Sequence, residues 1–244
     1  MTGPLELEPI AARGWPARRT ARLGGWRLHA SEGASSRINS CWPLAAPHRA
    51  AEAAIDAVEA WYAAFGLAPA FKLADGGFDP PDLPQRLAAR GYVPHTPTLT
   101  MTGPLDGEPD PAVVIGPDAG AGYTAVFADP AFGAGADAAE RLGALARMPR
   151  PRGFAVLTLD GVPAAVGACV IEGDWAGVIG MRTAPAHRRK GLARRVLRAL
   201  AAFARQEGAR RGYLQAEAGN AAAIALYRAE GFEDAYVYRY WRKS

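Results

Sequence analysis

The sequence is poor in the residues that build disulfide frameworks and metal centres. Its 244 residues include only 2 cysteines and 4 histidines. Cys41 and Cys169 lie far apart, each in an apolar run, which indicates buried free thiols rather than a disulfide framework. The histidines show none of the spacings typical of metal ligands, so we expect no metal site.

Long apolar runs are also missing. No stretch approaches the roughly 18 consecutive apolar residues that a membrane span needs. The N-terminus lacks the basic and then apolar segments of a secretory signal. We therefore expect a cytoplasmic protein with no membrane partner, built as one large domain or two small ones.

Neither sign of charge is in large excess. The chain carries 28 Lys and Arg against 24 Asp and Glu, a formal net charge of +4, and much of the positive charge falls between Arg182 and Arg211. This local basic character suits an anionic ligand and does not require nucleic acid. A nucleic-acid-binding surface over residues 194–211 is a separate hypothesis, but few aromatic residues lie there to stack on bases.

Hydrophobic periodicity and turn residues divide the chain into short strands and helices. After an irregular lead-in over residues 1–20, which has room for a short helix, the first half predicts strands at 25–30, 37–42, 71–73 and 96–101, and helices at 48–65 and 83–90. The second half predicts strands at 112–115, 154–159, 164–171, 175–181, 212–217 and 236–241. Its predicted helices lie within 123–147 and at 192–207 and 220–230. The strands from 154 to 181 predict an antiparallel meander that begins with a tight Asp160-Gly161 turn.

A basic turn between a predicted strand and a predicted helix carries the strongest chemical signal. The first N–H groups of a helix have no partners within it and point outward, and the helix dipole adds positive character there. Gly191 lets the backbone approach a ligand closely. The sequence therefore predicts a pyrophosphate site over residues 188–193 (Arg-Arg-Lys-Gly-Leu-Ala), although a solvated helix start fits this turn alone equally well.

The order of this turn and a later motif resembles the GNAT acetyltransferase superfamily. Thr183-Ala184-Pro185 followed by Arg-x-x-Gly-x-Ala is similar to the acetyl-CoA loop of that family. Later come Leu-Gln-Ala-Glu at 214–217, Asn220, Ala-Leu-Tyr at 225–227 and Gly-Phe at 231–232, in the order of the family's fifth strand, splayed turn, fourth helix and its glycine stop. The resemblance covers about residues 112–242.

The resemblance implies the α/β (α+β) GNAT fold, a mixed, mostly antiparallel twisted sheet flanked by helices. It implies direct transfer of acetyl from acetyl-CoA to a primary amine of a small molecule or a protein, by a monomer or a homodimer and with no metal. A non-catalytic acyl-CoA-binding sensor or scaffold is the alternative. The residues implied to bind acetyl-CoA are Met181, Arg182, Thr183, Arg188, Arg189, Lys190, Gly191, Leu192, Ala193, Asn220 and Tyr227.

Two residues are candidates for moving protons. Tyr227 is a plausible general acid toward the departing thiolate, and a packed core tyrosine is the alternative. Glu217, at the end of a strand, is the candidate base, with Glu172 and Asp174 as weaker ones; each also fits a solvated carboxylate. Asn220 suits a contact to pantetheine, or an ordinary helix cap.

The first half of the sequence resembles a degenerate repeat of the second half. Pro43 to Phe71 and Pro185 to Tyr213 both span 28 residues, and both halves end in a Gly-aromatic pair followed by a strand. The stretch after Pro43 has no glycine, and Pro47 removes an N–H that a phosphate cradle would need. We therefore expect a degenerate GNAT-like lobe at 1–103, a linker at 104–111 and the acetyl-CoA-binding domain at 112–244; an unrelated N-terminal domain is the alternative.

Overall fold

A continuous mixed sheet runs through the whole molecule. The computed structural model describes residues 2–243, and in that range the sheet has 11 strands in the order β1-β2-β3-β4-β11-β5-β10-β9-β8-β7-β6. The strands are β1 (Arg19–Leu23), β2 (Trp26–Ala30), β3 (Ser40–Pro43), β4 (Ala70–Ala74), β5 (Tyr92–Gly103), β6 (Val113–Gly116), β7 (Arg152–Leu159), β8 (Val162–Glu172), β9 (Trp175–Thr183), β10 (Arg211–Glu217) and β11 (Glu233–Lys243). Most neighbours are antiparallel; β3/β4 and β9/β10 are parallel.

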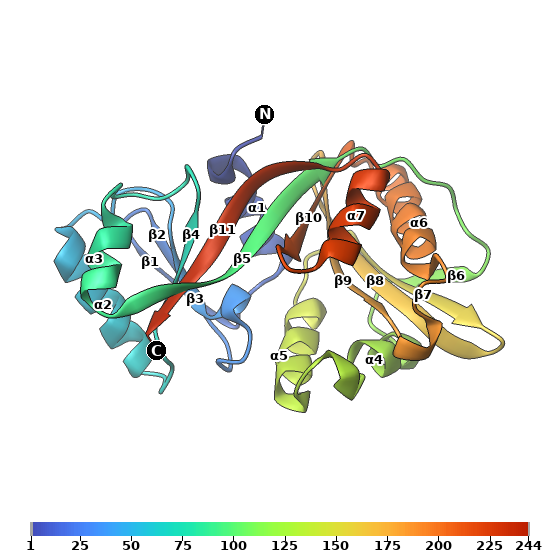
Figure 1. The fold of residues 1–244 in the computed structure, drawn as a ribbon, viewed down its shortest axis with the longest axis horizontal. Helices are drawn as coiled ribbons and strands as arrows, with labels where there is room; N and C mark the ends of the chain where they lie inside the picture. The colour runs from blue at the N-terminus through green and yellow to red at the C-terminus, as the bar shows by residue number, and fades with distance from the viewer. Residues whose placement is uncertain (1, 244) are drawn as a thin grey trace.

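Seven α-helices in this range flank the sheet (Figure 1). They are α1 (Pro4–Gly14), α2 (Ala51–Ala63), α3 (Leu83–Ala89), α4 (Ala121–Phe127), α5 (Gly135–Ala146), α6 (Leu192–Gln206) and α7 (Ala221–Ala229). Helices α2 and α3 cover the N-terminal half, and α4 to α7 the C-terminal half. Among the described residues, no helix combines the length and the apolar character needed to cross a bilayer.

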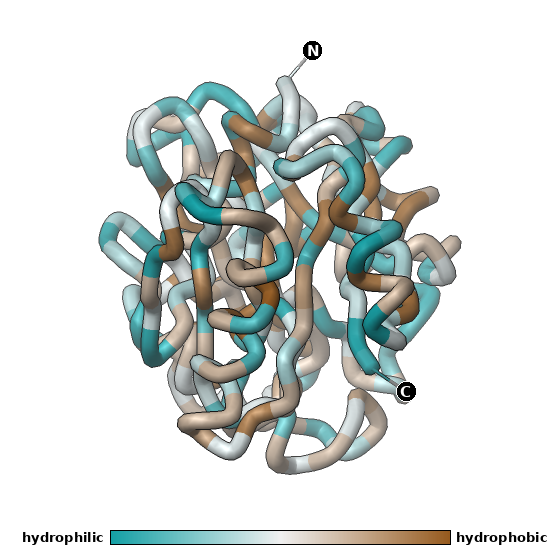
Figure 2. Tube along the Cα trace, turned by 90° about the vertical axis from the view of Figure 1, so that its left-hand side faces the viewer, coloured by the Kyte–Doolittle hydropathy of each residue, from teal (hydrophilic) through white to brown (hydrophobic). Residues whose placement is uncertain are grey.

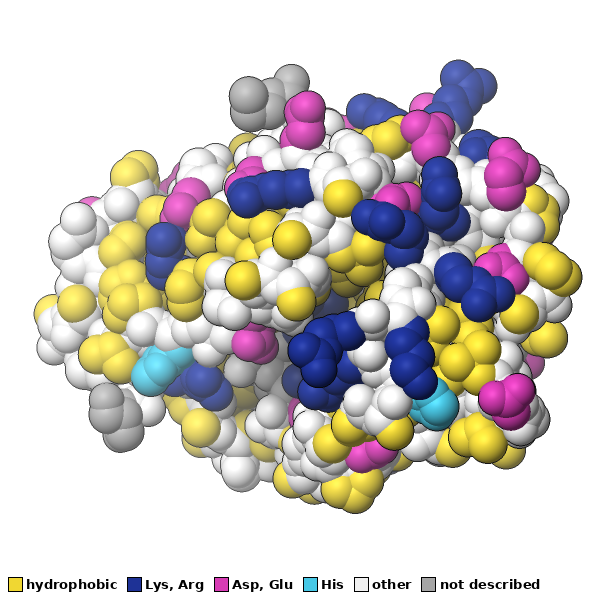
Figure 3. All heavy atoms as spheres, turned by 45° about the vertical axis from the view of Figure 1, so that its right-hand side comes forward, with side chains coloured by type: hydrophobic (Ala, Val, Ile, Leu, Met, Phe, Trp, Pro, Cys, Tyr) yellow, Lys and Arg dark blue, Asp and Glu magenta, His cyan; other side chains and the backbone are white. Residues whose placement is uncertain are grey.

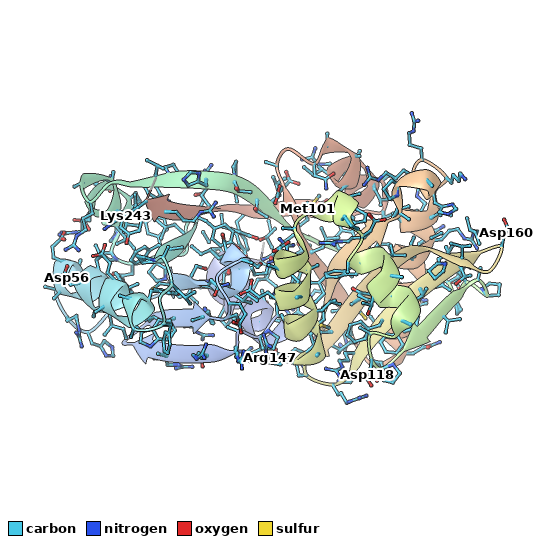
Figure 4. All side chains as sticks on the ribbon, turned by 90° about the horizontal axis from the view of Figure 1, so that it is seen from below. Asp56, Met101, Asp118, Arg147, Asp160 and Lys243 are labelled. Carbon is cyan, nitrogen blue, oxygen red and sulfur yellow. The ribbon has the colours of Figure 1, made fainter. Side chains whose placement is uncertain are left out.

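The last strands of the two halves are exchanged. Strand β5 pairs with β10 of the C-terminal half, and β11 pairs with both β5 and β4. Figure 1 shows these two long strands crossing the middle of the molecule. From below, Met101 of β5 lies where the halves meet, while Asp160 marks the far tip of the β7–β8 hairpin (Figure 4). Each half of the sheet is thus completed by a strand from the other half of the chain.

The two halves repeat one topology. In each, a strand, a helix, a parallel strand, a second helix and an exchanged final strand follow one another: β3-α2-β4-α3-β5 and β9-α6-β10-α7-β11. This repetition supports the predicted tandem relationship. The loop after β3 differs from its counterpart, because the N–H of Gly25 donates to the carbonyl of Ala46 at 2.7 Å and the β1–β2 turn therefore packs against it.

Separate hydrophobic cores lie on the two faces of the C-terminal sheet. Helices α6 and α7 cover one face, where Val196 and Leu200 pack with Leu214. On the other face, Tyr123 and Phe127 of α4 pack with Leu145 of α5. Viewed from the side of the N-terminal half, apolar stretches run through the interior, and polar stretches are frequent along the outside (Figure 2). The sheet therefore has two distinct sides, each covered by its own helices.

The linker and helix α6 are held together by arginines. Arg195 forms a bidentate contact with Asp110, at 2.6 and 2.9 Å, and Arg205 donates to the carbonyls of Leu105 and Gly107. Arg194 and Arg198 both pair with Glu230 of the α7 end. Much of the charge that suggested a nucleic-acid-binding surface is therefore neutralised within the protein.

Several predicted elements need correction. The lead-in contains helix α1, for which the sequence left room, and strand β1 follows it; β1 is exposed and polar, which conceals it in the sequence. The predicted strand at 37–42 is a 3₁₀ turn, η1 (Ser36–Ile38), followed by β3. The helix expected at 48–65 begins at Ala51, because His48 adopts a left-handed backbone conformation. The predicted helices within 123–147 are α4 and α5, with η2 (Pro130–Phe132) between them.

Candidate active site

Strands β9 and β10 part near the centre of the sheet. Their parallel pairing runs from Trp175↔Arg211 to Val178↔Leu214, and within residues 2–243 it extends no further. Beyond it, residues 179–182 of β9 and 215–217 of β10 line one cavity of about 500 Å³. The two strands are therefore parted here, and residues from both faces of the sheet line the gap.

A bulge in β9 faces this gap. Between Ile179 and Arg182 the strand has one residue more than the facing segment of β8, and Gly180 within it has φ +63°. A bulge leaves a residue unpaired in the ladder. A side chain at position 180 would meet the Tyr123 hydroxyl, since an added Cβ would lie 2.7 Å from it. The geometry therefore requires glycine here and frees backbone N–H groups beside the cavity.

The basic turn after β9 is open to solvent. After η3 (Pro185–His187), Arg189 and Gly191 both have positive φ, +61° and +73°, and Gly191 directly precedes α6. A Cβ built on Gly191 has no atom within 4 Å. Arg188, Arg189 and Lys190 are exposed. The unpartnered N–H groups at the start of the 15-residue helix α6 therefore face free space, as an anion cradle requires.

The other residues of the predicted acetyl-CoA set contribute in different ways. Leu192 is buried in the core with α6, so only its backbone is available, and Ala193 is half-buried. The backbones of Arg182 and Thr183 pair with β8 on one edge. The Arg182 side chain turns to α4, where its guanidinium lies 4.1 Å from the Phe127 ring centroid. Burial lowers the pKa of Arg182, with Arg141 acting in the same direction.

Tyr227 is both a packed tyrosine and a cavity residue. It is 7% exposed on α7 and packs beside Ile224 and Phe232, yet it also lines the gap. Burial raises its pKa to about 12. The hydroxyl is therefore protonated at neutral pH, as a proton donor must be.

The carboxylate candidates separate in space. Glu217 is exposed at the end of β10 and lines the cavity. Glu172 accepts hydrogen bonds from Arg13, and Asp174 lies 3.7 Å from Arg210; neither lines this cavity. Asn220 lines the cavity too, but its side chain accepts from the N–H of Ala223 at 3.2 Å and caps α7. Within residues 2–243, His, Cys, Asp and Glu side chains form no cluster suited to a metal ion.

The sequence did not indicate the N-terminal contribution to the cavity. Trp15, Ser35 and Arg37 line it, as do Tyr238 and Tyr240 of the exchanged strand β11. No local motif marks these residues, because the long-range strand exchange brings them together. Figure 3 shows Lys and Arg side chains gathered around the hollow on one face of the molecule.

Comparisons with known proteins agree with this geometry. A family model described as "Probable histone acetyltransferase Rv0428c C-terminal" matches residues 5–241. "Uncharacterized N-acetyltransferase YobR" of Bacillus subtilis is 25% identical over 260 residues, covering 96% of each chain. A solved GCN5-related N-acetyltransferase from Kribbella flavida aligns with a TM-score of 0.73 at 20% identity, covering 100% of this chain and 96% of its own.

A second solved structure bears on the tandem arrangement. It is described as a "Tandem GNAT protein from the clavulanic acid biosynthesis pathway (without AcCoA)" and aligns with a TM-score of 0.64 at 14% identity, covering 97% of this chain and 86% of its own. Its likeness concerns the fold, and it extends over both halves. Because the family model spans nearly the whole chain, the protein belongs to the Rv0428c C-terminal family and is an acyltransferase of the GNAT superfamily.

Proposed function

We propose that the protein is an N-acetyltransferase that moves acetyl from acetyl-CoA directly to a primary amine. This proposal rests on the presence, in one site, of an open basic turn at Gly191 and the parted strands β9 and β10. The turn would hold the pyrophosphate. The free edge of β9 would pair with the pantetheine amides as an added strand does, and so direct the thioester into the cavity.

In this proposal the transfer needs no covalent enzyme intermediate. The amine nitrogen attacks the thioester carbonyl carbon, and the developing oxyanion accepts hydrogen bonds from N–H groups of the β9 bulge around Gly180. The C–S bond then breaks, and the thiolate takes the proton of the Tyr227 hydroxyl. Glu217, directly or through a water molecule, receives the proton that the amine loses.

The two faces of the sheet suit two ligands. Tyr227 and the start of α6 lie on the α6/α7 side, which favours entry of CoA there. The cavity wall on the other side comes from α4, η2 and the N-terminal half, which favours approach of the acceptor from that side. Residues 1–103 would then act as a degenerate lobe that shapes the acceptor site, joined by the linker 104–111 to the acetyl-CoA-binding domain 112–244, in a cytoplasmic enzyme.

Acetyl-CoA turnover with a panel of primary amines tests the proposal. Release of free thiol in step with appearance of an N-acetyl product is expected for at least one amine, and Tyr227→Phe should slow it. Acetyl-CoA binding without amine-dependent thiol release, across small amines and peptide amines, would instead support a non-catalytic acyl-CoA sensor.

A further inference from the structure

The acceptor side of the cavity contains hydrogen-bond donors without acceptors. Among residues 2–243, the buried Nε1 of Trp15 and Nε2 of Gln215 have no hydrogen-bond partner. Trp15 is 6% exposed, and both residues line the cavity between β9 and β10. A buried donor left unpaired costs about 1 to 3 kcal/mol. Two such donors in one cavity indicate a ligand rich in oxygen acceptors.

A guanidinium without an acidic partner lies in the same wall. Arg37 of η1 donates one long hydrogen bond, 3.4 Å, to the Tyr238 hydroxyl, and its guanidinium carbon lies 5.7 Å from the Trp15 ring centroid. None of the ion pairs among the described residues involves Arg37. Tyr238 in turn donates to Gln215 Oε1 at 3.5 Å. Arg37, Tyr238 and Gln215 therefore form a connected polar group without an anion.

The balance of charge around this group is positive. Arg141 and Arg182 also line the cavity; Arg141 is paired with Asp137, and Arg182 lies among aromatic rings. The carboxylate that lines the cavity is Glu217, at the end of β10. Burial opposes ionisation of Tyr238, but Arg37 and Lys72 outweigh burial and lower its pKa. A strongly cationic acceptor would meet an unfavourable field here.

We propose that the acceptor is a primary amine that also bears a carboxylate, and that Arg37, Gln215 and Trp15 bind this carboxylate. This inference rests on the proposed acetyl transfer. A planar guanidinium binds a carboxylate through paired N–H groups, which also fixes its orientation. Gln215 and Glu217 lie two residues apart on one strand, so their side chains share a face about 7 Å apart. An acceptor held at Gln215 would direct its amine toward Glu217 and the β9 bulge.

The test compares acids with their carboxamides, which differ at the carboxylate alone. Suitable pairs are glycine, β-alanine, γ-aminobutyrate and phenylalanine with the corresponding amides. Calorimetry with the N-acetylated acids and amides, in the presence of CoA, measures product binding independently of turnover. We expect acids to bind at least about tenfold more tightly than their amides, the amount that a charge-assisted hydrogen bond supplies.

Variants test which residues produce the preference for acids over amides. Arg37→Gln should raise Kd and KM for the acids by about 10- to 100-fold and leave amides and acetyl-CoA affinity within about twofold. Arg27→Gln is the matched control, because it removes the same charge from a second, separate cavity; it should change neither series. Gln215→Glu, which adds a like charge without truncating the site, should weaken the acids as well.

Two outcomes would overturn the inference. One is that acids and amides bind and react alike, or that amides are preferred. The other is that Arg37→Gln weakens both series equally while remaining folded. Absence of turnover with every amine, despite acid-selective binding that Arg37→Gln abolishes, would instead contradict the proposed transferase activity and retain the carboxylate site.

Discussion

Replacement of Lys72 by methionine should destabilise the junction between the two halves. The ammonium of Lys72 lies 2.5 Å from Glu8, both side chains are 1% exposed, and the rings of Trp42 and Tyr238 have centroids 3.9 Å from it. Tyr236 donates to the other oxygen of Glu8 at 2.8 Å. The pair therefore links α1, β4 and the exchanged strand β11 in the interior.

The size of the effect follows from the charge left behind. Lys72→Met retains most of the apolar volume but leaves Glu8 buried without a counter-charge, which costs about 3 to 5 kcal/mol. For a chain of this length that corresponds to a fall in Tm of roughly 8 to 15 °C. In the double variant Lys72→Met with Glu8→Leu no buried charge remains, so most of the loss should be recovered, apart from about 1 kcal/mol for the hydroxyl of Tyr236.

Urea unfolding followed by tryptophan fluorescence measures these changes as a double-mutant cycle. The exposed pair Arg228–Asp234, at 2.7 Å, provides the control, and Arg228→Met should cost less than about 1 kcal/mol. A loss of unfolding free energy below about 1 kcal/mol for Lys72→Met would refute this reasoning. So would a double variant whose loss exceeds the sum of the losses in the two single variants.

Three further changes test other parts of the molecule. Tyr227→Phe should lower kcat by about 10²-fold or more and leave acetyl-CoA affinity unchanged. Because burial raises the pKa of Tyr227 to about 12, ionisation of this residue in the wild type should cause no decline of kcat below about pH 11. An unaltered kcat would make Tyr227 a core residue only. Gly180→Ala should lower kcat, because its Cβ would lie 2.7 Å from the Tyr123 hydroxyl at a positive φ, and acetyl-CoA affinity should be largely retained. Normal kinetics would remove the bulge from the mechanism. Burial lowers the pKa of His29 to about 4, against 6.5 in the unfolded chain, so only the unfolded state gains this proton as pH falls from 6.5 to 4. Stability should therefore decline by about 3 kcal/mol over that window, and urea titrations at each pH should show a decline smaller by that amount in His29→Gln; parallel profiles would contradict the assignment.

Local patterns predicted the elements that carry local signals. The spacing of Val196 and Leu200, and the glycine turn that precedes them, indicated α6 and its open start, because these features depend on residues close in sequence. The splayed turn after the strand at 212–217 followed from the family resemblance. The predicted sites of acetyl-CoA contact and proton transfer remain predictions, although the cavity contains Met181, Arg182, Glu217, Asn220 and Tyr227.

Long-range features escaped the sequence for a physical reason. The exchange of β5 and β11 depends on pairing between segments that lie more than a hundred residues apart, such as Tyr240↔His95, and no local signal encodes it. The same exchange brings Arg37 and Tyr238 to the cavity. The extent of helix α1 was obscured because Pro9 disfavours a helix interior, although Pro4 suits the first turn. Packing of Leu7 at the junction stabilises the helix. The domain boundaries at residues 103 and 112 remain a prediction, because each half of the sheet contains a strand that the other half of the chain supplies.

The central claim is that the bend at Gly191 binds the pyrophosphate of acetyl-CoA, and calorimetric titration of acetyl-CoA into Gly191→Glu tests it most directly. Gly161→Glu is the matched control, because Gly161 also has a positive φ (+80°) and no atom near its Cβ, but lies in the β7–β8 turn. We predict measurable binding to the wild type and to Gly161→Glu, and none to a folded Gly191→Glu, whose carboxylate would occupy the cradle. An unchanged affinity in Gly191→Glu would contradict the account.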